Sequence, residues 1–119
     1  MPYMLEVHGV LETNAFLAAA EDAGMSEEER DELVSFVACN PTVGALLTGT
    51  GGCRKFRYKK RGMGKSGGYR TVTYYAGVDV PIFMLTVFGK GEKANLTQAE
   101  RNALAKLTAT LKTDYRKKK

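Results

Sequence analysis

The chain is poor in the residue types that most often build metal, redox and acid–base centres. Its 119 residues include two cysteines, Cys39 and Cys53, a single histidine, His8, and no tryptophan. Two cysteines outside a CxxC spacing and one histidine supply neither a disulfide framework nor a set of metal ligands. We therefore expect free thiols in a reducing, cytoplasmic setting, and neither a metal nor another cofactor.

Long hydrophobic runs are also missing. The longest apolar stretch covers residues 80–88, far short of the about 20 residues that a membrane-spanning helix needs. No basic segment followed by an apolar one opens the chain, so we expect no signal peptide and no membrane partner. With 44% hydrophobic and 26% charged residues, the composition is that of an ordinary globular protein. The length predicts one domain over residues 1–119.

Acidic side chains are scarce after residue 40. Residues 1–40 carry a net charge of −8, whereas residues 41–119 carry +13. A solvated basic surface is the plain interpretation. However, eight bases without one acid within residues 53–75 would repel one another, so this segregation favours a polyanionic partner. The eight bases are Arg54, Lys55, Arg57, Lys59, Lys60, Arg61, Lys65 and Arg70.

Capping signals and apolar spacing predict three helices. The first covers about residues 14–23, and Gly24 ends it. The second follows a capping box at 26–29, whose acids complement the helix dipole, and stops at Asn40-Pro41. The third follows a second capping box at 97–100. We expect residues 113–119 to form a frayed basic tail. The predicted apolar stripe of the third helix is Leu104, Leu107, Leu111 and Tyr115.

Strands are predicted where the period changes to two, at residues 3–10, 53–60, 69–76 and 80–88. The last two form a hairpin, and strand 80–88, apolar on both faces, is expected to be central. Residues 41–52 are expected to be a loop rich in Gly and Thr. The order β-α-α-β-β-β-α predicts an α+β fold, with helices packed on a small antiparallel or mixed sheet.

Two familiar nucleotide- and DNA-binding patterns are approached but not met. Residues 62–68 look like a phosphate loop, but Lys59 stands where that pattern needs a glycine, and a strand rather than a helix follows. This segment is either a plain hairpin turn or a flexible basic loop against a phosphate backbone. The first two helices could suggest a helix-turn-helix, but their acidity disfavours contact with DNA phosphates.

Strand alternation places a basic set on one face of the predicted sheet. Lys55, Arg57 and Lys59 alternate with apolar neighbours, and Arg70 is expected beside them on the next strand. Tyrosines in strands are most often packed, but among cations their rings can also stack on the bases of single-stranded RNA. The candidate RNA-binding residues are Arg54, Lys59, Lys60, Arg61, Lys65, Tyr69, Tyr74 and Lys90.

Cationic side chains can cleave RNA without a pair of histidines. Scission requires removal of the 2′-hydroxyl proton, stabilisation of the pentacovalent transition state and protonation of the leaving 5′-oxygen. Crowded lysines repel each other's charge, which can free one of them as a base, whereas arginines stay charged and stabilise the transition state. His8 lies on the first predicted strand, where we expect a packed or surface imidazole.

Three strings of the sequence, taken together, resemble the RelE-type toxins and, within them, the HigB-like branch. They are GTGGCRK at 49–55, GKSGGYR at 64–70 and KGEKANLTQAE at 90–100, and the resemblance extends from about residue 13 to residue 112. It implies a RelE-like, microbial-ribonuclease-type fold. It also implies a type II toxin that cuts mRNA in the ribosomal A site, silenced by an antitoxin that in this branch often has a Cro-like DNA-binding domain.

The resemblance also assigns roles to residues. The family's basic strand positions fall on Lys55 and Arg57, its GYR arginine on Arg70, and its late basic region on 90–93. The pattern departs where Gly91 replaces an arginine and Thr97 replaces a catalytic tyrosine, so that Lys93, or a tyrosine of the sheet, is the candidate general acid. Two alternatives stay open: a ParE-like poison of DNA gyrase on the same fold, and a non-catalytic RNA-binding module. The implied catalytic set is Lys55, Arg57, Arg70 and Lys93.

Overall fold

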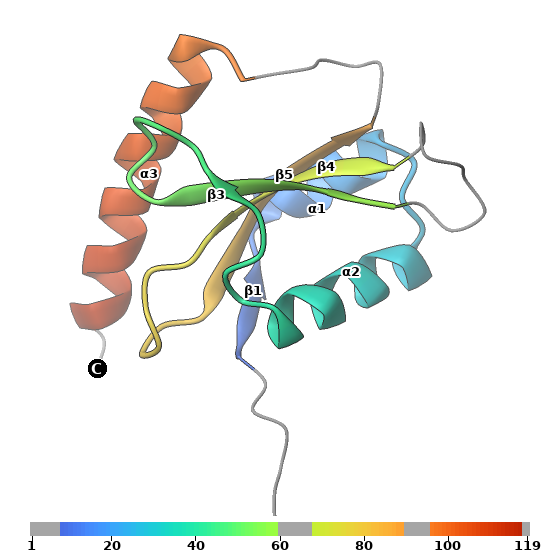
Figure 1. The fold of residues 1–119 in the computed structure, drawn as a ribbon, viewed down its shortest axis with the longest axis horizontal. Coiled ribbons are helices and arrows are strands. Elements are labelled where there is room, and N and C mark those ends of the chain that lie inside the picture. The colour runs from blue at the N-terminus through green and yellow to red at the C-terminus, as the bar shows by residue number, and fades with distance from the viewer. Residues whose placement is uncertain (1–7, 60–67, 90–95, 118–119) are drawn as a thin grey trace, which may run out of the picture.

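The chain folds into a mixed sheet with helices on both faces, as a computed structural model shows (Figure 1). The structure describes residues 8–59, 68–89 and 96–117. This arrangement confirms the predicted α+β class. In chain order the elements are β1 (Val10–Glu12), α1 (Asn14–Asp22), α2 (Glu27–Cys39), β2 (Ala45–Leu46), β3 (Cys53–Tyr58), β4 (Tyr69–Tyr74), β5 (Ile82–Gly89) and α3 (Gln98–Lys117).

The five strands are arranged in the order β1-β5-β4-β3-β2. β1 runs parallel to β5, and every other neighbouring pair is antiparallel. The predicted hairpin of β4 and β5 and the interior position of β5 are both confirmed. Within the described residues the first strand begins at Val10, where its pairing with β5 starts at Ile82, so the prediction is wrong for residues 8 and 9. Residues 3–7 of the predicted strand lie outside the described ranges. The expected loop 41–52 contains β2, which pairs with β3.

α1 and α2 cover one face of the sheet. The Thr13 hydroxyl caps α1 by accepting a hydrogen bond from the Phe16 backbone N–H, and the predicted Ser26–Glu29 capping box opens α2. Both boundaries follow from short-range chemistry and are confirmed. The two helices then bury an apolar face against β5. The core on this side includes Phe16, Ala20, Leu33, Val37, Ile82, Met84 and Val87.

α3 covers part of the opposite face. The predicted capping box holds its start, with the Thr97 backbone N–H donating to Glu100 and the Glu100 N–H donating to the Thr97 hydroxyl. Leu107 is 40% exposed, contrary to the predicted stripe, and Thr108 takes the buried place at 1%. The Thr108 hydroxyl lies 3.0 Å from the backbone carbonyl of Thr50, which ties α3 to the loop before β3.

The C-terminal helix is longer than expected. α3 continues to Lys117, so the frayed tail predicted at 113–119 is wrong over residues 113–117. Its last turn is held by packing, since the ring of Tyr115 meets Phe83 edge-on with the centroids 6.2 Å apart. No helix within residues 8–59, 68–89 and 96–117 has the length and apolar character to cross a membrane.

The position of α3 divides its sheet face into two halves. Cys53 at the start of β3 and Tyr74 at the end of β4 belong to the apolar cluster against which α3 packs. In Figure 1, α3 lies across the end of the sheet where β3 begins, and the far ends of β3 and β4 extend away from it. Arg57 and Arg70, which the sequence predicts on one face of the sheet, lie toward these far ends.

Candidate nucleic-acid interface

Two arginines face each other across the sheet on the half that α3 leaves uncovered. Arg57 on β3 pairs directly with Arg70 on β4, and Lys55 pairs with Val72. Since alternate residues of a strand share a face, Lys55, Arg57 and Arg70 lie on the same side of the sheet. The predicted grouping of these three cations is therefore present in the fold.

Arg70 is the one residue of β4 that is not buried. It is half-buried, whereas Arg57 opposite it is exposed and Lys55 is half-buried. The Arg70 guanidinium makes no hydrogen bond or ion pair with any residue of the described ranges. A strand that buries five of its six side chains thus presents a single cation toward a second cation.

Apolar side chains surround this pair. On its other side Arg70 pairs with Phe88 of β5, which is 4% exposed, and Val72 is fully buried. Like charges placed directly opposite each other destabilise a sheet. A phosphate placed between Arg57 and Arg70 would be attracted by both cations, so their direct pairing favours an anionic ligand.

Gly68 fixes the entry into β4. Its φ is +128°, a conformation that residues with a side chain rarely adopt. A Cβ at this position would stand 2.9 Å from the Tyr58 carbonyl oxygen and 3.3 Å from Cγ of Arg57. The close approach of Gly68 to β3 sets the register in which Arg70 meets Arg57.

Three of the predicted RNA-binding residues lie elsewhere. Tyr69 is 2% exposed on the α2 side, with its hydroxyl 3.3 Å from Oε1 of Glu29, and Tyr74 is 4% exposed, stacked on Phe83. Neither ring is open to a base, because Tyr69 belongs to the core on the side of α1 and α2 and Tyr74 to the cluster against which α3 packs. Arg54 points to the face opposite Arg57 and donates to the carbonyl oxygens of Thr42 and Gly44, so it holds the loop before β2.

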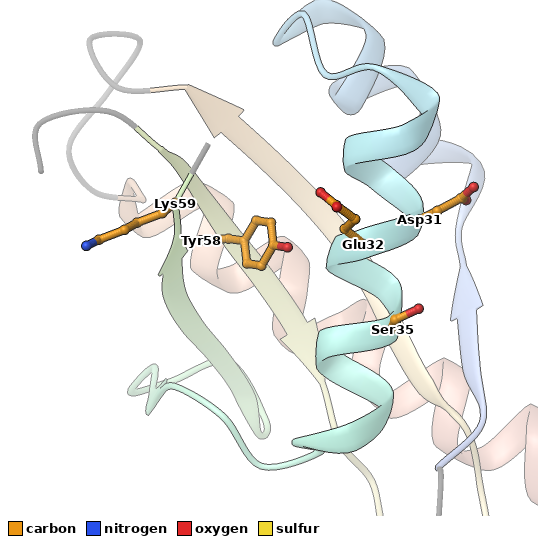
Figure 2. A pocket seen from close by; sticks show the side chains of 5 residues that line it. All are labelled: Asp31, Glu32, Ser35, Tyr58 and Lys59. Carbon is orange, nitrogen blue, oxygen red and sulfur yellow. The ribbon is translucent and has the colours of Figure 1, made fainter. Parts of the chain in front are cut away.

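The remaining predicted residues fall at or beyond the limits of the described chain. Lys59 is exposed and points away from α2 (Figure 2). The other candidates lie outside the described residues, so their predicted roles stay predictions: Lys60, Arg61, Lys65, Lys90 and Lys93.

His8 is a packed imidazole, as predicted. Its Nε2 lies 2.7 Å from the Val80 carbonyl oxygen, and its ring is 5.4 Å from that of Tyr75. It sits next to the start of β5, whereas Arg70 pairs near the end of that strand. The distance along β5 from Ile82 to Phe88 is about 20 Å at the rise of a β-strand, so His8 belongs to a different end of the molecule.

The extent of α3 over the sheet face that carries Lys55, Arg57 and Arg70 was not predicted from the sequence. The contact between Thr108 and the Thr50 carbonyl fixes α3 over the other half of the sheet. A signal for it exists in the sequence: residues 104, 108, 111 and 115 keep the helical spacing of four, three and four better than the stripe through Leu107. A threonine in that stripe indicates a buried hydroxyl with a specific acceptor.

The comparison with known families bears on the whole domain. A family model described as the RelE toxin of the RelE / RelB toxin-antitoxin system matches residues 10–118. The chain belongs to the RelE toxin family. The match runs from β1 through α3 and therefore includes the uncovered half of the sheet. As a RelE-family toxin, the protein has an antitoxin as its partner.

Proposed function

We propose that this RelE-family toxin is a ribosome-dependent endoribonuclease of the HigB-like branch, which cuts mRNA in the ribosomal A site and stops translation. The observation that carries the proposal is the direct pairing of Arg57 with Arg70, beside Lys55, on the uncovered half of the sheet. Three cations in this arrangement suit a phosphodiester whose charge rises during the reaction.

In this proposal the arginines hold the scissile phosphate. A guanidinium donates two parallel hydrogen bonds to phosphate oxygens and stays charged throughout, so Arg70 and Arg57 stabilise the pentacovalent transition state. We assign removal of the 2′-hydroxyl proton to Lys55, the third member of the trio. The 2′-oxygen then attacks phosphorus and the 5′-oxygen leaves, which yields a 2′,3′-cyclic phosphate and a 5′-hydroxyl end. We assign protonation of the 5′-oxygen to Lys93.

Dependence on the ribosome follows from the neighbours of the trio. On the same sheet face, Arg57 and Arg70 adjoin Lys55, Val72 and Phe88. This set offers cations to a phosphate, but it contains no group that would orient the bases or sugars of a free, flexible RNA. We therefore propose that the ribosome supplies the positioning, by holding the mRNA in the geometry that the cations need.

The test is in vitro translation with purified toxin. Primer extension that maps new 5′ ends within the A-site codon supports the endoribonuclease. Inhibition of DNA supercoiling by gyrase, with intact mRNA, would identify a ParE-like poison instead. RNA binding without cleavage or gyrase inhibition would identify a non-catalytic module.

The partner can be tested in the cell. We propose that the antitoxin carries a Cro-like DNA-binding domain, is encoded beside the toxin and acts with it in the cytoplasm. Expression of the toxin alone should arrest growth, and co-expression of the neighbouring reading frame should restore it. Unimpaired growth with folded toxin present would contradict the toxin's proposed action on translation.

A further inference from the structure

A groove separates α2 from the end of β3, on the sheet face opposite the arginine pair. Its volume is about 510 Å³, and its lining residues are Asp31, Glu32, Ser35, Tyr58 and Lys59. In Figure 2, Tyr58 extends from β3 toward α2 and Glu32 extends from α2 toward β3, whereas Asp31 and Lys59 point away from the space between them. The groove therefore has one aromatic wall, from Tyr58, and one wall that carries the Glu32 carboxylate.

Apolar surface continues past Ser35. Phe36 on α2 is 37% exposed, and its ring lies 5.6 Å from the ring of Tyr58 and 5.9 Å from that of Phe56. A partly exposed phenylalanine beside a tyrosine offers a surface on which a side chain can stack. The aromatic wall is thus wider than the ring of Tyr58 alone.

The dipole of α2 accounts for some of its acids but not for those of the groove. Glu27, Glu28 and Glu29 lie in the first turn, where carboxylates complement the helix dipole, and Glu29 closes the capping box. Asp31 and Glu32 follow in the next turn, beyond the range of that effect. Arg30, the one base of the helix, is engaged with Glu12 at 2.9 Å. The position of Glu32 is therefore outside the first turn, where the helix dipole acts on a carboxylate.

We propose that this groove binds a segment of the antitoxin that places an arginine or lysine beside Tyr58 and the carboxylate of Glu32, and an apolar side chain against Phe36. A cation over a tyrosine ring is attracted by its electrons, and a guanidinium pairs well with a carboxylate. The proposal rests on family membership, which supplies the antitoxin, and not on the proposed ribonuclease activity.

Charge complementarity selects this occupant. The acidic wall repels RNA, so the ribosome and mRNA are directed to the opposite face, where Arg57 and Arg70 lie. Neighbouring residues of β3 point to opposite faces, which puts Tyr58 and Arg57 on different sides of one strand. An antitoxin seated in the groove would leave the arginine pair itself uncovered.

Paired charge reversals test the groove. The variant Asp31→Lys/Glu32→Lys should bind the antitoxin encoded beside the toxin at least about tenfold more weakly by calorimetry at low salt. The control Glu21→Lys/Asp22→Lys changes the net charge equally at exposed positions near the end of α1, and should bind within about twofold of wild type. Phe36→Ala should weaken binding without changing any charge.

Several results would overturn the proposal. One is equal affinity of the groove and control variants for the antitoxin. Another is a reversal that changes self-association of the toxin in sedimentation but not antitoxin binding, which would identify a second copy as the occupant. Circular dichroism monitors folding, and Asp31→Asn/Glu32→Gln keeps the test open if the lysines disturb α2. Cleavage on programmed ribosomes is measured separately, so its failure in wild type would affect the proposed ribonuclease alone.

Discussion

Arg57 and Arg70 are direct cross-strand partners, in a sheet where opposed like charges raise the free energy of the fold. In directly opposed pairs such as this one, the two Cβ atoms are about 4.5–5.5 Å apart. An anion between the two side chains would interact favourably with both cations. The pair is therefore the feature that most directly connects this fold to a phosphate ligand.

The first prediction separates charge from geometry at this pair. Arg70→Lys keeps the positive charge but loses the planar fork that contacts two phosphate oxygens. Cleavage on programmed ribosomes should fall about a hundred- to thousandfold, the usual loss for one oriented transition-state contact. Ribosome binding should change little. Single-turnover rates measure the effect, with Arg101→Lys on α3 as the matched control, and equal rates for Arg70→Lys and wild type would move catalysis away from Arg70.

The second prediction concerns salt. If phosphate contacts dominate RNA binding, the logarithm of the affinity should fall by about 0.7 for each contact per tenfold rise in salt. The variant Arg57→Ala, which removes one cation, should make this slope shallower by about 0.7, the value for one contact. Fluorescence anisotropy with a single-stranded oligonucleotide, repeated over a tenfold range of salt, gives both slopes. A flat dependence for wild type would exclude a phosphate-dominated interface.

The third prediction tests the attachment of α3. Thr108→Val keeps the shape of the side chain but removes the hydroxyl that contacts the Thr50 carbonyl in a buried site. The free energy of unfolding, measured by urea denaturation, should fall by about 1–2 kcal/mol, since a buried acceptor loses its partner. The control is Thr110→Val, which removes an exposed hydroxyl that donates only within α3, to the Lys106 carbonyl. Equal losses for both variants would show that the contact with Thr50 contributes nothing.

The fourth prediction concerns the two thiols. Burial raises the pKa of Cys53 from 9.0 to about 11, with a smaller opposing effect from its hydrogen bond to Thr50. As pH rises, this thiol ionises at a lower pH in the unfolded chain than in the folded protein. The stabilisation that the neutral thiol provides is therefore complete below about pH 9 and is lost toward pH 11. Cys39 is exposed. In a Cys39→Ser variant at pH 8, Cys53 should react with a thiol reagent only as fast as the protein unfolds, and rapid labelling would show that the site opens locally.

Much of the fold is predictable because its signals are short-range. The capping boxes at Ser26 and Thr97 fix helix starts through contacts three residues apart, and the structure contains both. Strand alternation likewise places Lys55 and Arg57 on one face without knowledge of the partner strand. The first strand is harder to place because three residues carry little periodicity, and its position is set by pairing with β5.

The site is predictable only in part, because the contacts that shape it join residues far apart in the sequence. Tyr69 and Tyr74 look like aromatic partners of the neighbouring bases, but each ring is packed in a core cluster, one on either side of the sheet, which alternation within one strand does not reveal. Which half of the sheet stays open depends on where α3 packs, and this depends on Thr108 and Thr50, which are far apart in the sequence. The acids next to the first turn of α2 look like helix-dipole partners until β3 supplies the other wall of the groove.

The measurement that tests the central claim most directly is cleavage of one mRNA in two settings. Purified toxin is incubated with the mRNA alone and with the same mRNA on translating ribosomes, and new 5′ ends are mapped by primer extension. We predict ends within the A-site codon, with a 2′,3′-cyclic phosphate on the upstream fragment, that form on ribosomes and are barely detectable on free mRNA. Equal cleavage in both settings, or intact mRNA on stalled ribosomes, would contradict a ribosome-dependent endoribonuclease built on Arg57 and Arg70.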